Sequence, residues 1–379
     1  MFDVTFALCG ERFRVRYRLT GDEREARAKA GDICVEQTIE FPAALVAGGD
    51  IRDHILGRIE AFEAAGPNVH LATISYAVET SGLELPQLLN VIFGNTSIKP
   101  GVRVERLELS PRVLAAFRGP RFGVGGIRRL LGAATRPLLA TALKPMGLPA
   151  ATLADFAYRF ALGGIDLIKD DHGLANQSFT PFRERVERCA EAVARANRET
   201  GGHGLYLPNI TGPFEAVLDN ARFAKQAGAG GFLVSPGLVG LDTLRCLAAD
   251  DSLGLPIMAH PALLGSYVTS PDNGLSHEAL FGQVARLAGA DATIFPNYGG
   301  RFSFNRAECQ AIAACCAEPM GALPAILPAP GGGMDLARIP DMLETYGRDV
   351  VFLIGGALHQ RGPDLAANAR YFRELVERA

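Results

Sequence analysis

The stretch Gly163-Gly164-Ile165-Asp166-Leu167-Ile168-Lys169-Asp170-Asp171-His172 reads as a short buried strand that ends in a cluster of charged side chains. Side chains alternate between the two faces of a strand, so Lys169 and Asp171 are expected to point the same way. A buried lysine and carboxylate are costly unless an ion pair, a metal ion or catalysis offsets the cost. This strand end is therefore the first candidate for a functional site.

Seven further apolar runs resemble this strand, and an amphipathic helical segment follows each of them. The eight runs are Leu138–Lys144, Asp166–Asp171, Leu205–Thr211, Gly231–Ser235, Pro256–His260, Ala292–Asn297, Ala325–Ala329 and Val350–Ile354. Non-alternating apolar strands joined by helices indicate a parallel sheet that is buried on both faces. Eight such units predict an α/β fold with a (β/α)8 TIM barrel, and a doubly wound sheet is the alternative.

Residues 1–118 follow a different pattern, which predicts a smaller α+β domain ahead of a barrel domain that spans residues 119–379. Strands are expected where apolar residues alternate or cluster, and helices where Glu, Ala, Arg or Leu dominate. The expected strands are Phe13–Leu19 and His70–Val78, and the expected helices are Asp22–Lys29 and Pro86–Phe93.

Composition limits the classes of function. The chain has 379 residues, of which 48% are hydrophobic, and its net charge is -3 without a basic stripe, so no nucleic-acid partner is expected. No apolar run reaches the roughly 18 residues of a membrane span, and no signal peptide is visible, so no membrane association is expected. Seven cysteines without CxxC spacing favour reduced thiols and a cytoplasmic location.

Nearly every predicted strand ends in a polar residue or a glycine. The carboxyl ends of the strands form the active-site face of a barrel, so these residues are expected to converge. Glycines at 331–333 and 355–356 follow strands seven and eight, where backbone N–H groups commonly bind phosphate, although such glycines also make ordinary tight turns. The other strand-end residues are Lys144, Asn209, Ser235, His260 and Asn297.

Six short stretches suggest a family. They are Gly119-Pro120-Arg121-Phe122-Gly123, Gly126-Ile127-Arg128, Arg136-Pro137-Leu138-Leu139, Lys144-Pro145, Gly164-Ile165-Asp166 and Lys169-Asp170-Asp171. In these stretches the chain resembles the large subunit of RuBisCO, and still more the RuBisCO-like proteins of form IV that do not fix carbon dioxide, and the resemblance covers nearly its whole length.

The resemblance implies a metal-dependent enzyme in which a base removes a proton next to a carbonyl and Mg2+ stabilises the enediolate. Lys144 matches the proton-abstracting lysine, and Lys169 matches the lysine that carbon dioxide converts to a carbamate. Asp171 matches a metal ligand, and His172 stands where the carboxylases have a glutamate ligand. A carbamate supplies the oxygen donor that Mg2+ prefers.

The resemblance also assigns substrate contacts. Glu36 and Asn95 match residues that reach the active site of a partner subunit, which implies a homodimer with shared sites. His260 matches a histidine beside the substrate, and the expected catalytic set is Lys144, Lys169 and His260. Further substrate contacts are expected from Asn209 and Arg301. One phosphate site is expected at Gly332, Gly333, Gly355 and Gly356.

Several departures from the carboxylase pattern affect the expected reaction. His172 removes one negative charge, which suits Mn2+ or another divalent ion better than Mg2+. Pro261 stands in place of a phosphate-binding arginine. The segment Phe295–Arg301 lacks the mobile-loop lysine, which Arg301 replaces only in part. A substrate with a single phosphate is therefore expected, without carbon dioxide fixation.

Three functions remain open at this point. The first is a lyase-type enzyme that decarboxylates or cleaves a phosphorylated keto-sugar acid such as 3-oxo-isoapionate 4-phosphate, in apiose breakdown. The second is an enolase or isomerase of methylthio-pentulose phosphates in methionine salvage. The third is a catalytically idle relative that binds a sugar phosphate.

Overall fold

The computed structural model describes residues 7–46 and 49–378, which group into two compact units. The first unit contains the described residues through Phe117 together with residues 264–287 and 319–323. The second unit contains residues 118–263, 288–318 and 324–378. A domain boundary at residues 118 and 119 stays a prediction, and the sequence pattern does not predict the two segments that return to the first unit.

A five-stranded sheet forms the centre of the first unit. In spatial order the strands are β10 (Gly274–Leu275), β4 (Val102–Glu108), β1 (Arg12–Thr20), β3 (Val69–Ala77) and β2 (Arg58–Gly66). All neighbours are antiparallel except β10 and β4. Short helices α3 (Pro111–Ala115) and α10 (Ala285–Leu287) also belong to this unit.

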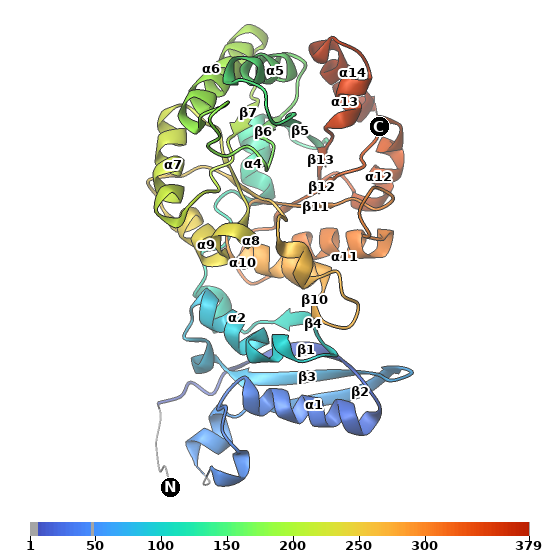
Figure 1. Ribbon diagram of the computed structural model, residues 1–379. Coiled ribbons are helices and arrows are strands. Elements are labelled where there is room, and N and C mark those ends of the chain that lie inside the picture. The colour runs from blue at the N-terminus through green and yellow to red at the C-terminus, as the bar shows by residue number, and fades with distance from the viewer. Residues whose placement is uncertain (1–6, 47–48, 379) are drawn as a thin grey trace. The chain divides into compact units, whose positions relative to one another are not determined.

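Two longer helices cover this sheet. Helix α1 (Glu23–Glu36) begins at a capping box, in which Asp22 and Glu25 each accept a hydrogen bond from the other's backbone N–H, and it packs against β1, β2 and β3 (Figure 1). In α2 (Leu85–Phe93), the carbonyl oxygen of Ile92 accepts a 2.7 Å hydrogen bond from the Tyr17 hydroxyl of β1. These contacts bury the alternate residues of β1, as its sequence pattern predicts.

The four elements expected in this region are confirmed as β1, β3, α1 and α2, with α1 extending beyond the expected end. Strand β2 was not predictable from periodicity, because nearly all of its side chains are exposed and no buried face imposes alternation.

The second unit is the expected barrel. Its eight parallel strands, in spatial order, are β7 (Leu205–Leu207), β6 (Leu167–Asp170), β5 (Leu138–Leu143), β13 (Val351–Leu353), β12 (Leu327–Gly331), β11 (Ala292–Pro296), β9 (Ile257–Ala259) and β8 (Phe232–Val234). The N–H of Ile210 donates to the Leu233 carbonyl at 3.0 Å, and this bond links the two ends of the sheet. A closed barrel is therefore formed, and the doubly wound alternative is wrong.

Helices surround the barrel (Figure 1). They are α5 (Ala150–Leu162), α6 (Phe182–Thr200), α7 (Phe214–Gln226), α8 (Pro236–Val239), α9 (Leu241–Ala249), α11 (Arg306–Ala317), α12 (Ile339–Tyr346), α13 (Gly356–Gln360) and α14 (Leu365–Arg378). Helix α4 (Gly123–Leu131) precedes the first strand, and its Ile127 and Leu131 pack into one apolar cluster with residues of all eight strands. Leu138 of β5 and Leu167 of β6 belong to this cluster, which identifies the inward-facing positions of both strands.

Two details of the barrel differ from the sequence pattern. Strand β12 begins two residues later than expected, at Leu327, and includes Pro328 and Pro330, which lack the N–H that most strand residues donate. After β9 the chain does not pass directly into a barrel helix, because residues 264–287 belong to the first unit.

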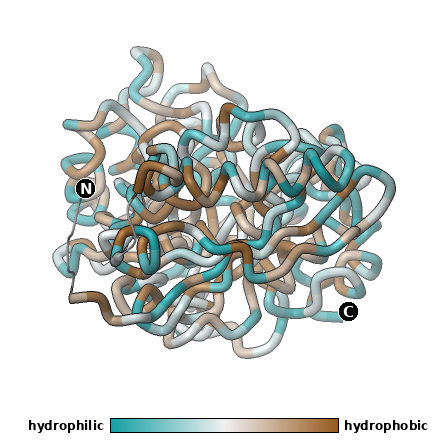
Figure 2. The backbone as a smooth tube through the Cα atoms, turned by 90° about the horizontal axis from the view of Figure 1, so that it is seen from below, coloured by the Kyte–Doolittle hydropathy of each residue, from teal (hydrophilic) through white to brown (hydrophobic). Residues whose placement is uncertain are grey.

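The described residues contain no helix that is long and apolar enough to span a membrane. Figure 2 colours the backbone by hydropathy, and hydrophobic and hydrophilic stretches alternate along it.

A buried aspartate holds together the start of the barrel. Asp291, which is 1% exposed, accepts hydrogen bonds from the N–H groups of Phe122 at 2.7 Å, Gly123 at 2.8 Å and Ile257 at 2.9 Å. One carboxylate thus fixes the beginning of α4 next to β9 and β11.

Asp291→Asn is expected to lower the free energy of unfolding by about 2 kcal/mol, because the new amide N–H₂ faces a backbone N–H and leaves it unsatisfied. Urea unfolding measures the change. Asp155→Asn on α5, where Asp155 forms an exposed ion pair with Arg159, is the matched control and is expected to change stability by under about 0.5 kcal/mol. Equal effects of the two substitutions would contradict this role for Asp291.

Candidate active site

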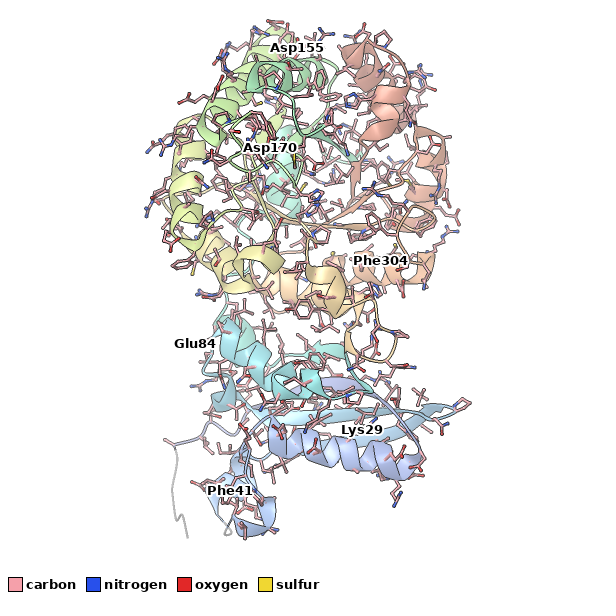
Figure 3. The ribbon with its side chains drawn as sticks, viewed as in Figure 1. Lys29, Phe41, Glu84, Asp155, Asp170 and Phe304 are labelled. Carbon is pink, nitrogen blue, oxygen red and sulfur yellow. The ribbon has the colours of Figure 1, made fainter. Side chains whose placement is uncertain are left out.

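Strand β6 ends in the charged residues Lys169 and Asp170, and Asp171 follows directly. Leu167 points into the barrel, so Lys169 and Asp171 are expected on the same inward side, whereas Asp170 faces the surrounding helices. The contacts agree with this alternation, because Asp170, which is labelled in Figure 3, pairs with Arg185 of α6. Asp170 therefore serves the packing of the barrel, whereas Lys169 and Asp171 lie on the side where the chemistry is expected.

Asp170 is the centre of a fully buried network. It accepts hydrogen bonds from Arg185 Nε at 3.0 Å, from the Tyr206 hydroxyl at 2.8 Å and from the Asn209 backbone N–H at 3.0 Å. Both charged side chains are completely buried. Asp170 and Arg185 thus neutralise each other, and neutral hydrogen-bond donors stabilise the Asp170 carboxylate further.

The same network holds the turn that follows β6. Arg185 also donates to the carbonyl oxygens of Thr180 at 3.0 Å and Ala175 at 2.8 Å. The Asn209 side-chain amide donates to the carbonyl oxygens of His172 at 3.0 Å and Leu174 at 2.9 Å. Hydrogen bonds from Arg185 and Asn209 therefore hold the backbone of the turn at His172, Leu174 and Ala175.

Lys169 is 2% exposed, and its Nζ donates to the Asp170 carbonyl oxygen at 3.0 Å. Burial lowers the pKa of Lys169 to about 8, against the attraction of Asp171, and the positive charge of Lys144 acts in the same direction as burial. Near neutral pH, a much larger fraction of this amine is neutral than for an exposed lysine. A neutral amine is the form that reacts with carbon dioxide.

Lys144, Asp171 and His172 lie side by side at this end of the barrel. The Lys144 Nζ is 3.9 Å from Asp171 Oδ2, and His172 Nδ1 is 3.2 Å from Asp171 Oδ1. The rings of His172 and His260 stack with their centroids 4.4 Å apart and their planes 10° apart. The structure therefore brings the residues expected for catalysis and metal binding together.

His260 follows β9 and is held as a neutral ring. Burial lowers the pKa of His260 to about 2, and the nearby Lys169 and His172 add to the effect. Its Nδ1 accepts a 3.1 Å hydrogen bond from the Ala262 N–H, so the proton of the neutral ring resides on Nε2. His260 can thus donate a hydrogen bond to a substrate oxygen.

The donor set fits a divalent cation once Lys169 is modified. No group of three His, Cys, Asp or Glu side chains suited to a metal occurs in the described part of the chain. Asp171 and His172 provide two adjacent donors, and a carbamate on the buried Lys169 amine would supply an anionic oxygen as the third. These three residues are the ones that would hold the ion.

The expected phosphate glycines follow the neighbouring strands β12 and β13. Gly332 and Gly333 have φ values of 74° and 83°, which favour glycine. A Cβ on Gly333 would lie 2.4 Å from the Cα of Gly300, so this turn also requires glycine for close packing. Gly355 ends the turn after β13, and Gly356 begins α13. Phosphate binding at these glycines stays a prediction.

Two expected substrate contacts have other partners in the structure. Both N–H groups of the Asn209 amide bond to backbone, and its Oδ1 accepts from the Thr211 N–H at 3.2 Å, so a substrate contact there stays a prediction. Arg301 is exposed, and its guanidinium carbon lies 5.1 Å from the centre of the Phe302 ring.

Glu36 and Asn95 lie together on the first unit. Asn95 Nδ2 donates to Glu36 Oε1 at 3.0 Å, and Lys99 Nζ lies 3.4 Å from Glu36 Oε2. The hydrogen bond from Asn95, with the Lys99 charge, lowers the pKa of the Glu36 carboxyl. Sequence reasoning identified the first two residues but missed Lys99, which also pairs with Asp32.

Sequence reasoning also missed Arg185. It lies in Phe182-Arg183-Glu184-Arg185-Val186-Glu187-Arg188, where charged residues are typical of an exposed helix face. The only available signal was Asp170, whose position opposite to Lys169 and Asp171 calls for a buried cation on a neighbouring helix.

Comparison with known proteins identifies the class of this barrel. The family described as ribulose bisphosphate carboxylase large chain, catalytic domain, matches residues 123–377. The chain belongs to this family.

Its relatives narrow the identification. The chain is 41% identical to ribulose bisphosphate carboxylase-like protein 1 of Rhodopseudomonas palustris, over 97% of this chain and 98% of the relative. It is also 41% identical to 5-methylthioribulose-1-phosphate isomerase of Rhodospirillum rubrum, over 92% and 91% of the two chains. A crystal structure of a RuBisCO-like protein from Rhodopseudomonas palustris superimposes with a TM-score of 0.88 and 39% identity, covering 97% of each chain. The chain is a RuBisCO-like enzyme of the non-carboxylating kind.

The low pKa of Lys169 predicts carbamate formation at that residue. With 13C-labelled bicarbonate, a protein carbamate signal in the NMR spectrum is expected to grow as the pH rises from about 6 to about 9, because the neutral amine becomes the major form. The signal is expected to disappear in Lys169→Met and to persist in the control Lys29→Met, which alters a lysine of α1. A signal that survives Lys169→Met would contradict the assignment.

Proposed function

We propose that this enzyme isomerises a phosphorylated ketose by moving a proton at a carbon next to the carbonyl group, with 5-methylthioribulose 1-phosphate as the leading substrate. The observation that carries the proposal is the position of Lys144, whose Nζ lies beside Asp171 and next to the buried Lys169. The isomerase of Rhodospirillum rubrum, at 41% identity, supports the choice of substrate.

Each residue of the site has a role in this reaction. Lys144 Nζ, as the neutral amine, removes the proton from carbon, becomes an ammonium and then returns the proton to carbon, and His260 Nε2–H donates to the substrate oxygen on which negative charge develops. Lys169, as its carbamate, Asp171 and His172 would hold Mg2+ or Mn2+, which polarises the substrate carbonyl when bound. His172 also stacks on His260, and this contact keeps both imidazole rings in one orientation.

The two ends of the substrate need separate anchors. Backbone N–H groups at Gly332, Gly333, Gly355 and Gly356 are suited to the single phosphate. Arg301 and Asn209 are the remaining candidates for contacts with hydroxyl groups at the other end.

Arg301 supports a second candidate reaction, which is decarboxylation or C–C cleavage of 3-oxo-isoapionate 4-phosphate. No carboxylate of the described residues pairs with Arg301, and this exposed cation follows β11 at the carboxyl end of the barrel. A free guanidinium suits a substrate carboxylate, which binds in bidentate fashion. Loss of the carboxyl group leaves the same kind of enediolate that proton removal produces, so both reactions use the same residues.

The test is to incubate the enzyme with Mg2+ or Mn2+, bicarbonate and each sugar phosphate in turn, and to follow products and carbon dioxide by NMR. Isomer formation from 5-methylthioribulose 1-phosphate is expected, and Lys144→Met is expected to lower kcat at least about 100-fold. Lys225→Met, on the exposed face of α7, is the control and is expected to behave as the wild type.

The outcomes separate the candidates. Carbon dioxide release from 3-oxo-isoapionate 4-phosphate, without isomerisation of the thio-sugar, would show that the enzyme is a decarboxylase and would contradict the proposed isomerase reaction. Binding of either compound without turnover or solvent-proton exchange would identify an idle relative and overturn the proposal.

We further propose a homodimer in which Glu36 and Asn95 of one subunit complete the partner's active site. Both are polar and paired on the first unit, while Lys144 belongs to the second unit. A dimer of this kind places two equivalent sites across one two-fold axis.

Mixing Asn95→Ala with Lys144→Met tests this sharing. Each mixed dimer contains one site with both substitutions and one intact site, so random subunit exchange is expected to restore about a quarter of wild-type activity. Native mass spectrometry verifies the exchange. Proven exchange without recovered activity would contradict shared sites.

A further inference from the structure

Lys144 occupies space that a side chain at position 355 would fill. Gly355 follows β13, which is the neighbour of β5 in the barrel. A Cβ atom built on Gly355 would lie 2.8 Å from Lys144 Cε and 2.9 Å from Lys144 Nζ. Both distances are shorter than a Cβ atom tolerates, so any residue other than glycine requires the end of the lysine to move.

The φ of Gly355 is −114°, outside the left-handed region that holds Gly332 and Gly333, and its ψ is −85°. The contact that limits the size of a side chain at 355 is the lysine beside it.

The space that Gly355 leaves open is occupied by the end of the Lys144 side chain, whose Nζ is the proposed base. On its other side, Lys144 Nζ is 3.9 Å from Asp171 Oδ2, and Lys144 is close enough to Lys169 to lower the pKa of that amine. The flexible lysine side chain has several rotamers, and only some of them keep Nζ at this place.

We propose that Gly355 is a positioning residue for Lys144, in addition to any contact of its N–H with phosphate. The inference rests on the proposed proton transfer by Lys144. An alanine at 355 moves the lysine end at little expense to the fold, because a flexible side chain rather than backbone must give way, but proton transfer depends on the placement of Nζ. A displacement of about 1 Å at a reacting group is enough to lower a rate about 100-fold.

The neighbouring glycine provides a matched comparison. A Cβ on Gly356 would meet no atom within 4 Å, although Gly356 belongs to the same turn and the same expected phosphate site. Any change caused by alanine at 356 is therefore expected in phosphate binding and in KM. Gly125→Ala in α4, where a Cβ also meets nothing within 4 Å, controls for a glycine-to-alanine change outside the site.

The experiment compares the kinetics of the three variants with the wild type on the substrate that it turns over. Gly355→Ala is expected to lower kcat about 100-fold with KM within about twofold, to alter the pH profile of kcat, and to keep the thermal midpoint within a few degrees of the wild type. Gly356→Ala is expected to affect mainly KM, and Gly125→Ala is expected to match the wild type. A Gly355→Ala enzyme with unchanged kcat, or with a loss confined to KM, would overturn the inference.

A second readout does not depend on turnover. The rate at which an amine-specific reagent modifies Lys144, followed by peptide mass spectrometry, is expected to change in Gly355→Ala and to stay the same in Gly125→Ala. An unchanged rate in Gly355→Ala would overturn the inference, even if the wild type proves inactive on both sugar phosphates and the proposed function fails.

Discussion

The buried ion pair between Asp170 and Arg185 is the constraint on which the candidate site depends. Breaking such a pair leaves an uncompensated charge in the interior, which typically costs about 3–5 kcal/mol. Arg185 and Asn209, which both donate to Asp170, also donate to the carbonyl groups of His172, Leu174 and Ala175. The interaction that stabilises the contact between β6 and α6 thus also holds the turn that carries Asp171 and His172. Asp170 stabilises the fold, and its neighbours Lys169 and Asp171, on the opposite face, belong to the candidate site.

The lowered pKa of Lys169 makes the stability of the folded protein depend on pH. Its pKa in the folded protein is about 8, below the ordinary value of 10.5, so the folded protein binds fewer protons than the unfolded chain between these values. Stability therefore rises as the pH increases from about 8 to about 10.5, and this contribution is lost as the pH falls through about 8. Conversion of the amine to a carbamate would remove the buried cation, which links the chemistry of Lys169 to the stability of the barrel.

The sequence was sufficient for much of the fold. Eight apolar runs predicted the barrel, because buried parallel strands carry a continuous apolar signal that few other folds repeat eight times. The same reasoning was less accurate for β12, whose prolines interrupt that signal, and it could not predict the segment 264–287, because the side on which a loop packs depends on tertiary contacts.

The site was predictable where strand alternation or family motifs applied. Alternation placed Lys169 and Asp171 on one face, and the family motif pointed to Lys144 and His260. Arg185 and the space at Gly355 were not predictable, since the first looks like an exposed helix residue and the second depends on the distance between two strands that are far apart in the chain.

The most direct test of this account compares Asp170→Asn with Asp171→Asn. We measure, for each, the free energy of unfolding in urea and the binding of Mn2+ in the presence of bicarbonate. Asp170→Asn is expected to lower stability by at least about 3 kcal/mol, because Arg185 loses its charge partner. Asp171→Asn is expected to stay within about 1 kcal/mol of the wild type and to lose Mn2+ binding, because this carboxylate serves the site. Equal losses of stability, or Mn2+ binding that survives Asp171→Asn, would contradict the division of roles along β6.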